Sequence, residues 1–276
     1  MDAAPAEERL QWVDVVAHDI QANVRGWVTI PACASGRRRG EAQSTAEILD
    51  DIRRSAPQVG VLLEHAGHHA FAWSKDRVGA PADVPLTTGE RRPRPLEAQE
   101  WSDIHDAFVS TAKQALQRGM RVGVVLDDDT LWHAHLSPRL HPGVTQDDRQ
   151  ARVLRLVRAL LKVSPDVVVA ACVDDLCPDG MDPLAGQRWV QALVSVGVHK
   201  LLLSTGSAAM PLLAERALRV TTGMSQQHHA LLAPVVRAAK LVDAEVWAAG
   251  PFADTASMTV PSPLAGVVRW TRERQP

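Results

Sequence analysis

The chain has 276 residues, of which 46% are hydrophobic and 22% charged, which is enough apolar material for one large folded domain. Its formal net charge is −2 and its basic residues are scattered, which disfavours a nucleic-acid partner. Its first residues lack a leader pattern and its apolar runs are far shorter than the ~20 residues of a membrane span, so we expect a cytoplasmic protein with no membrane partner.

Short β-branched runs alternate with longer segments of helical period, as expected for strand–helix units around a parallel sheet. In chain order, the expected strands cover residues 27–30, 59–63, 121–126, 166–173, 200–204, 245–249 and 266–270. The expected helices cover residues 7–21, 44–54, 97–118, 146–162, 183–196 and 227–240. A (β/α) barrel forming a single domain over residues 1–276 fits this alternation, and so does a doubly wound open sheet.

Local signals support the expected helix ends. Ser44 and Glu47 have the spacing of a capping box, and Gly119 and Gly197 stand where helices should stop. Residues 70–95 are rich in glycine and proline and read as a long irregular loop. Because loops of that length are uncommon unless they cover something, we expect this one to form a lid over the barrel mouth.

Residues 59–70, VGVLLEHAGHHA, resemble the third-strand motif of the old yellow enzyme family, an apolar strand running into His-Ala-Gly and a basic residue. Further segments follow in that family's order, among them Leu136-Ser-Pro138 and Ser204-Thr-Gly206. Within the family, the chain is most similar to the oxidoreductase half of proteins of the salicylyl-CoA hydroxylase and 2-aminobenzoyl-CoA monooxygenase/reductase type. The resemblance implies a TIM (β/α)8-type barrel with its site at the carboxyl ends of the strands.

The resemblance also implies FMN as cofactor and a small-molecule substrate, either an aromatic or enone compound or an aromatic acyl-CoA. The family's first strand should precede Trp27, and residues 1–26 leave that strand either lost or reduced. A barrel open by one strand has an exposed edge that needs covering. We therefore expect a homo-oligomer or a partner protein.

Several positions depart from the family pattern on the side that holds the flavin ring and the substrate. The fourth-strand segment, residues 125–132, lacks the His/Asn pair that polarises the substrate carbonyl, and its aspartates only accept hydrogen bonds when ionised. The glutamine that holds the flavin pyrimidine edge corresponds to Leu62, and the arginine near the flavin N1 corresponds to about Ala170. The ring-binding side is therefore predicted to be weakened.

The phosphate side is closer to the family. Gly250 and Arg272 correspond to the phosphate-binding glycine and arginine, and Gly206 ends the Ser-Thr-Gly motif, so these three residues are the predicted cofactor-binding residues. For catalysis the sequence offers only weak candidates, His65 and Asp128. His65 combines the family position with a strand end, and its alternative role is that of a satisfied buried histidine.

A metal site is a further interpretation of the strand ends. Aspartates at 127–129 and 174–175 and the histidines 65, 68, 133 and 135 come from neighbouring segments. Aspartates in such loops commonly cap the following helix instead, so no metal site is predicted. Cys33, Cys172 and Cys177 form no paired pattern and are interpreted as ordinary thiols in a reducing compartment.

Two functions remain open from the sequence. One is a diverged FMN-dependent NAD(P)H oxidoreductase with a weakened flavin site. The other is a catalytically inactive barrel that acts as a binding or partner module, for example beside a flavin monooxygenase.

Overall fold

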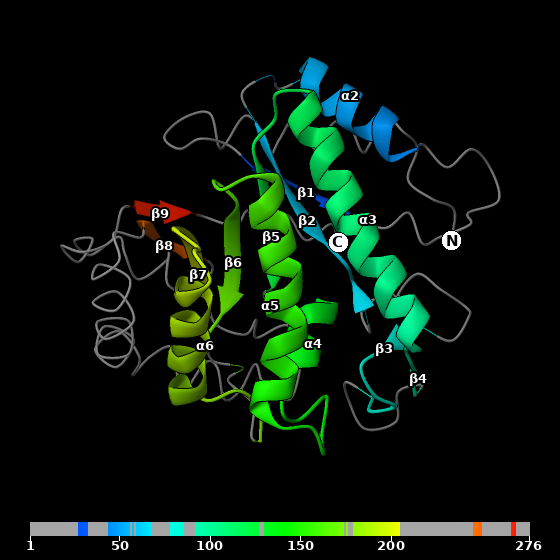
Figure 1. The fold of residues 1–276 in the computed structure, drawn as a ribbon, viewed down its shortest axis with the longest axis vertical. Coiled ribbons are helices and arrows are strands. Elements are labelled where there is room, and N and C mark those ends of the chain that lie inside the picture. The colour runs from blue at the N-terminus through cyan, green and yellow to red at the C-terminus, as the bar shows by residue number, and fades with distance from the viewer. Residues whose placement is uncertain are drawn as a thin grey trace, which may run out of the picture.

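The computed structural model describes residues 27–32, 44–55, 57, 59–67, 78–85, 92–126, 130–173, 175, 179–204, 245–249 and 266–268. Within these ranges lies a seven-stranded parallel sheet (Figure 1). Its strands are β1 (Trp27–Pro31), β2 (Gly60–Glu64), β5 (Val122–Leu126), β6 (Val168–Cys172), β7 (Lys200–Ser204), β8 (Glu245–Ala249) and β9 (Gly266–Val268). They pair in the order β1-β2-β5-β6-β7-β8-β9.

This strand order decides between the two folds that fit the alternation. A doubly wound sheet reverses its strand order partway, at the switch point where ligands bind. Here the order follows the chain from the first strand to the last, as in a (β/α) barrel. The barrel prediction is confirmed, whereas the strand expected before Trp27 falls outside the described residues.

Helices α2 (Thr45–Ser55), α3 (Ala98–Gln117), α5 (Gln146–Val163) and α6 (Pro183–Ser195) match four of the expected helices. The helices expected at 7–21 and 227–240 lie outside the described residues. The Ser44–Glu47 capping box is present, since each residue's backbone N–H donates to the other's side chain. Gly119 and Gly197 follow helices with φ of 70° and 100°, a conformation that favours glycine. No helix in the described ranges is long and apolar enough to cross a membrane.

The expectation of a wholly irregular loop at 70–95 is wrong in part. β3 (Gly79–Ala80) and β4 (Arg94–Pro95) pair as a small parallel sheet, seen in Figure 1 near the start of α3. Leu96 packs against Gly79, where an added Cβ would lie 2.4 Å from its Cδ2. Arg94 also donates to Glu100 in the first turn of α3, at 2.6 Å. These contacts join residues 79–80 to the end of the segment, and its role as a lid stays a prediction.

Period-two alternation in the strands produces two apolar layers. The larger lies between the sheet and α3, α5 and α6, which cover one face of the sheet in Figure 1. The other face carries a smaller group, here called the interior cluster, which consists of Trp27, Leu62, Val125, Val168, Ala170 and Leu202. Space inside it is tight, because a Cβ added to Gly123 would lie 2.5 Å from Leu62 Cδ2. The interior face of β1, β2, β5, β6 and β7 is thus packed with apolar side chains.

Candidate functional site

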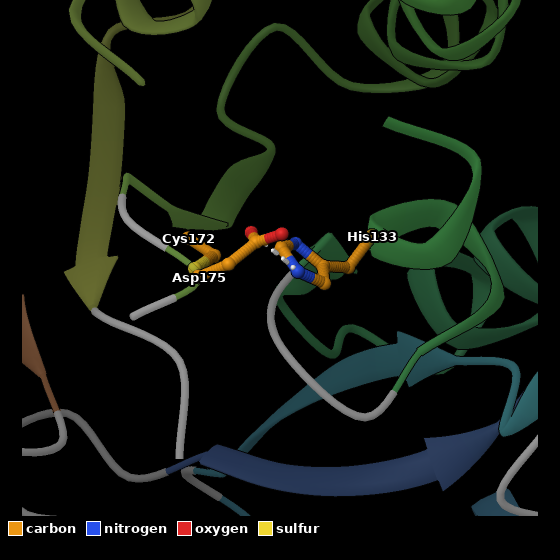
Figure 2. A group of neighbouring side chains, drawn as sticks. All are labelled: His133, Cys172 and Asp175. Carbon is orange, nitrogen blue, oxygen red and sulfur yellow. Dashed lines mark ion pairs between the residues drawn. The ribbon is translucent and has the colours of Figure 1, made fainter. Parts of the chain in front are cut away.

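Three buried side chains of different chemistry meet where β5 and β6 end (Figure 2). His133 belongs to the short helix α4 (Leu131–Leu136), which follows β5. Cys172 is the last residue of β6, and Asp175 follows three residues later. Their exposed fractions are 3%, 0% and 7%, so the group, here called the His-Cys-Asp cluster, is shielded from water.

Close polar contacts define the geometry of the cluster. His133 Nε2 lies 2.9 Å from Asp175 Oδ1, and the Ser137 hydroxyl donates to Asp175 Oδ2 at 2.7 Å. Figure 2 shows the imidazole directed at the carboxylate, with Cys172 beside Asp175. One donor atom each from His133, Cys172 and Asp175 lie within 4.8 Å of one another. Nitrogen, sulfur and oxygen donors are therefore gathered in one small buried volume.

Local backbone features hold each member in place. Thr130 caps the amino end of α4. Its hydroxyl accepts from the His133 N–H at 3.2 Å and so fixes the first turn of the helix. The Asp175 N–H donates to the Met181 carbonyl at 2.9 Å. Gly180 lies against the carboxylate, since an added Cβ would be 2.4 Å from Asp175 Oδ2. Gly180 and Met181 therefore hold Asp175 in place beside His133.

The electrostatic environment keeps Asp175 ionised. Burial alone would raise the pKa of Asp175, but the neighbouring His133 and the hydrogen bonds from His133, Ser137 and the backbone at Met181 lower that pKa overall. A buried carboxylate of this kind requires a positive partner, because an unpaired buried charge is costly. His133 Nε2, 2.9 Å from the carboxylate, provides that partner when its imidazole is protonated.

Cys172 connects the cluster to the barrel interior. Alternate strand residues share a face, and Val168 and Ala170 of β6 belong to the interior cluster. Cys172 is the next residue of that row, at the carboxyl end of the strand. The His-Cys-Asp cluster thus lies at the end of the barrel where (β/α)-barrel proteins place their functional residues.

His65, the first-ranked histidine of the sequence, lies apart from this cluster at the end of β2. Its Nδ1 accepts from the Gly67 N–H at 3.1 Å, and its carbonyl accepts from the Leu131 N–H at 2.7 Å. Burial lowers the pKa of His65 to about 4, so its imidazole is neutral near pH 7. These contacts join the end of β2 to the start of α4, and a catalytic role for His65 stays a prediction.

The other predicted site residues, Asp128, Gly206, Gly250 and Arg272, lie outside the described residues, and so do the aspartates at 127, 129 and 174 and His68. Among the histidines and aspartates considered as metal ligands, the structure brings together His133 and Asp175. His135 instead packs against Trp101, with ring centroids 5.0 Å apart. Cys172 was interpreted as an ordinary thiol, although its place in the interior row could have indicated that it faces the barrel mouth.

The two positions that correspond to the family's flavin-ring contacts, Leu62 and Ala170, are both buried in the interior cluster. Leu62 lies on β2 and Ala170 on β6, the two strands that flank β5. Leu62 is in register with Gly123 of β5, and Ala170 is in register with Val125 of the same strand. Val125, the first residue of the segment that lacks the His/Asn pair, belongs to the same cluster. These described positions offer a flavin ring no polar side chain, so they do not fit the family's mode of holding it.

No protein-family model matches the chain, and no curated protein matches it. Solved structures do. The chain is similar to 2-naphthoyl-CoA reductase in complex with 2-naphthoyl-CoA, with a TM-score of 0.58 and 14% identity. This match covers 81% of the present chain and 37% of the reductase chain. Over 95% of this chain and 76% of the other, it is similar to morphinone reductase, with a TM-score of 0.63 and 14% identity.

A third similar structure is histamine dehydrogenase from Rhizobium sp. 4-9, with a TM-score of 0.64 and 13% identity over 90% of this chain and 38% of the other. The chain therefore spans less than half the length of two of these proteins and about three quarters of morphinone reductase. These neighbours are TIM-barrel oxidoreductases of the old yellow enzyme family. At such low identity the likeness confirms the predicted fold.

Proposed function

We propose that this chain is an old yellow enzyme-like barrel that has lost flavin-dependent reduction and acts as a binding or partner module. The observation that carries the proposal is the joint burial of Leu62 and Ala170 in one apolar cluster. In the family pattern these two positions serve the flavin ring. Here they pack against one another and supply neither a hydrogen bond nor a charge.

The energetic consequence is large. A hydrogen bond to a charged or strongly polar group contributes about 1.5–3 kcal/mol, and removal of one partner leaves the other desolvated. Loss of an amide and a guanidinium together would therefore weaken ring binding by several kcal/mol, or at least a hundredfold in affinity. Contacts to the phosphate alone would have to compensate for that loss.

A second candidate is a flavin-dependent oxidoreductase with an aromatic, enone or acyl-CoA substrate. It is favoured by the fold likeness to morphinone reductase and to 2-naphthoyl-CoA reductase bound to 2-naphthoyl-CoA. Gly206, Gly250 and Arg272, which the sequence assigns to the phosphate side, are the residues that would hold FMN. The flavin would supply hydride transfer, and the protein residues would position it.

Flavin binding distinguishes the two candidates. We expect the purified chain to lack flavin absorbance and to show no change in the FMN spectrum or in FMN fluorescence during titration. We also expect no NADH or NADPH oxidation above that of free FMN. A preparation that holds stoichiometric FMN, bleaches with NADH or NADPH, and loses FMN on Arg272→Ala would overturn the first candidate and support the second.

A further inference from the structure

We infer that His133, Cys172 and Asp175 form a zinc site at the carboxyl end of the barrel. Their donor atoms lie within 4.8 Å of one another and come from two elements far apart in the sequence, α4 and the end of β6. All three side chains are buried. The site goes beyond the proposed function and does not depend on whether flavin binds.

The donor set selects the kind of metal. Zinc combines cysteine sulfur, histidine nitrogen and carboxylate oxygen in one tetrahedral site, whereas magnesium and calcium prefer oxygen donors alone. One thiolate and one carboxylate also balance the charge of a divalent ion, so the occupied site is electrically neutral. Neutrality matters here because the group lies in a water-excluded volume.

The separation of the histidine and carboxylate ligand atoms is close to that of an occupied site. Zinc–nitrogen and zinc–oxygen bonds of about 2.1 Å at tetrahedral angles place the two ligand atoms about 3.4 Å apart. His133 Nε2 and Asp175 Oδ1 are 2.9 Å apart. To bind the metal between them, these two atoms must move apart by about half an ångström. A small change in side-chain torsion angles is enough for such a shift.

Surrounding contacts orient these ligands as they do in zinc proteins, where groups outside the first shell fix the ligand geometry. The Ser137 hydroxyl donates to Asp175 Oδ2 at 2.7 Å and leaves Oδ1 directed at His133. The Thr130 hydroxyl fixes the first turn of α4 at His133. Three protein ligands leave a fourth position for water or a ligand, the arrangement of a reactive rather than a purely structural zinc site.

Cobalt replaces zinc in such sites and reports sulfur ligation by a thiolate-to-metal absorption band in the near ultraviolet. We expect the chelator-treated full-length chain to bind one equivalent of Co²⁺ with this band, and one equivalent of Zn²⁺ to remove it. Cys172→Ser is expected to abolish the band, and Asp175→Asn to weaken Co²⁺ binding at least tenfold. Cys33→Ser, a matched loss of a different thiol, should bind as the wild type does.

Two outcomes would overturn the inference: a wild-type chain that takes up no stoichiometric Co²⁺ or Zn²⁺, or a sulfur band that survives Cys172→Ser. The wild-type titration needs no variant, so it stands even if Cys172→Ser fails to fold, which circular dichroism would show. Ser137→Ala keeps all three ligands and removes only the hydrogen bond to the carboxylate. It should lower the zinc affinity about tenfold, and unchanged affinity would count against the site.

Discussion

Burial controls the ionisation of His65 and His135. Burial lowers the pKa of His135 to about 3, with smaller effects from His141 and nearby arginines, and it lowers the pKa of His65 to about 4. In the unfolded chain a histidine titrates near pH 6.5. Below that pH the unfolded state binds more protons than the folded state, so stability that is complete above pH 6.5 is lost as the pH falls toward 4.

This linkage gives a prediction at the residue scale. From pH 7.5 to pH 5, each of these histidines should lower the unfolding free energy by about 2 kcal/mol. Urea unfolding at a series of pH values measures the loss, and the lowered pKa of Asp175 places its own contribution below this window. His135→Phe keeps a ring against Trp101 and removes the titrating group. If its pH dependence equalled that of the wild type, burial of His135 would not be the cause.

Individual residues also show where the sequence was informative. Leu62 and Ala170 could be recognised as apolar replacements, because their strands and alternation were evident, and the structure places both in the interior cluster. His133 and Asp175 were among the groups considered at neighbouring strand ends, but Cys172 was not added to them, because the 39 positions between His133 and Cys172 are closed only by the pairing of β5 with β6. Strand neighbours are a tertiary property that spacing does not encode.

At the scale of elements, α6 packs against the end of β6 through Gly186. An added Cβ at this position would lie 1.9 Å from the Val173 carbonyl oxygen, which is backbone and cannot rotate away. We expect Gly186→Ala to lower the unfolding free energy by about 3 kcal/mol, measured by denaturant unfolding. Gly143→Ala is the control, since its Cβ meets nothing within 4 Å, and only its φ of 76° costs about 1 kcal/mol. Equal losses in the two variants would contradict close packing as the cause.

Long elements were predictable and short ones were not. The main helices have capping residues and a clear apolar face, which gave their existence and their approximate ends. α4 has only six residues and all six are buried, so it shows no apolar and polar faces from which a helix could be recognised. β3 and β4 have two residues each, and their pairing depends on contacts such as Leu96 on Gly79.

At the scale of the whole molecule, the seven-stranded sheet and the large apolar layer against its helices predict cooperative unfolding. The larger apolar layer extends continuously from α2 and β1 to α6 and β7, and a single domain over residues 1–276 stays a prediction. We therefore expect coincident denaturant transitions by tryptophan fluorescence and by far-ultraviolet circular dichroism. Two separated transitions would indicate two units. The Leu202→Ala variant, which opens a space in the interior cluster, should shift both signals together.

The alternation of strands and helices predicted the fold class but left an open sheet and a barrel equally open, and only the family resemblance favoured the barrel. Both architectures use the same buried parallel strands, so each strand has the same composition in either one. The difference lies in which strand neighbours which, and the order β1-β2-β5-β6-β7-β8-β9 is visible only in three dimensions.

Trp27 begins β1 and lies across Gly60, and the Arg121 guanidinium stacks on its ring at 4.6 Å. Both residues stand at the amino ends of their strands, opposite the His-Cys-Asp cluster. From these amino ends, apolar side chains occupy the interior face of β1, β2, β5, β6 and β7 as far as Ala170. We therefore expect a molecule that approaches from the carboxyl ends of these strands to stop at the level of Cys172. Shallow seating favours a compact head group at that depth, with any longer part of the ligand left outside the barrel.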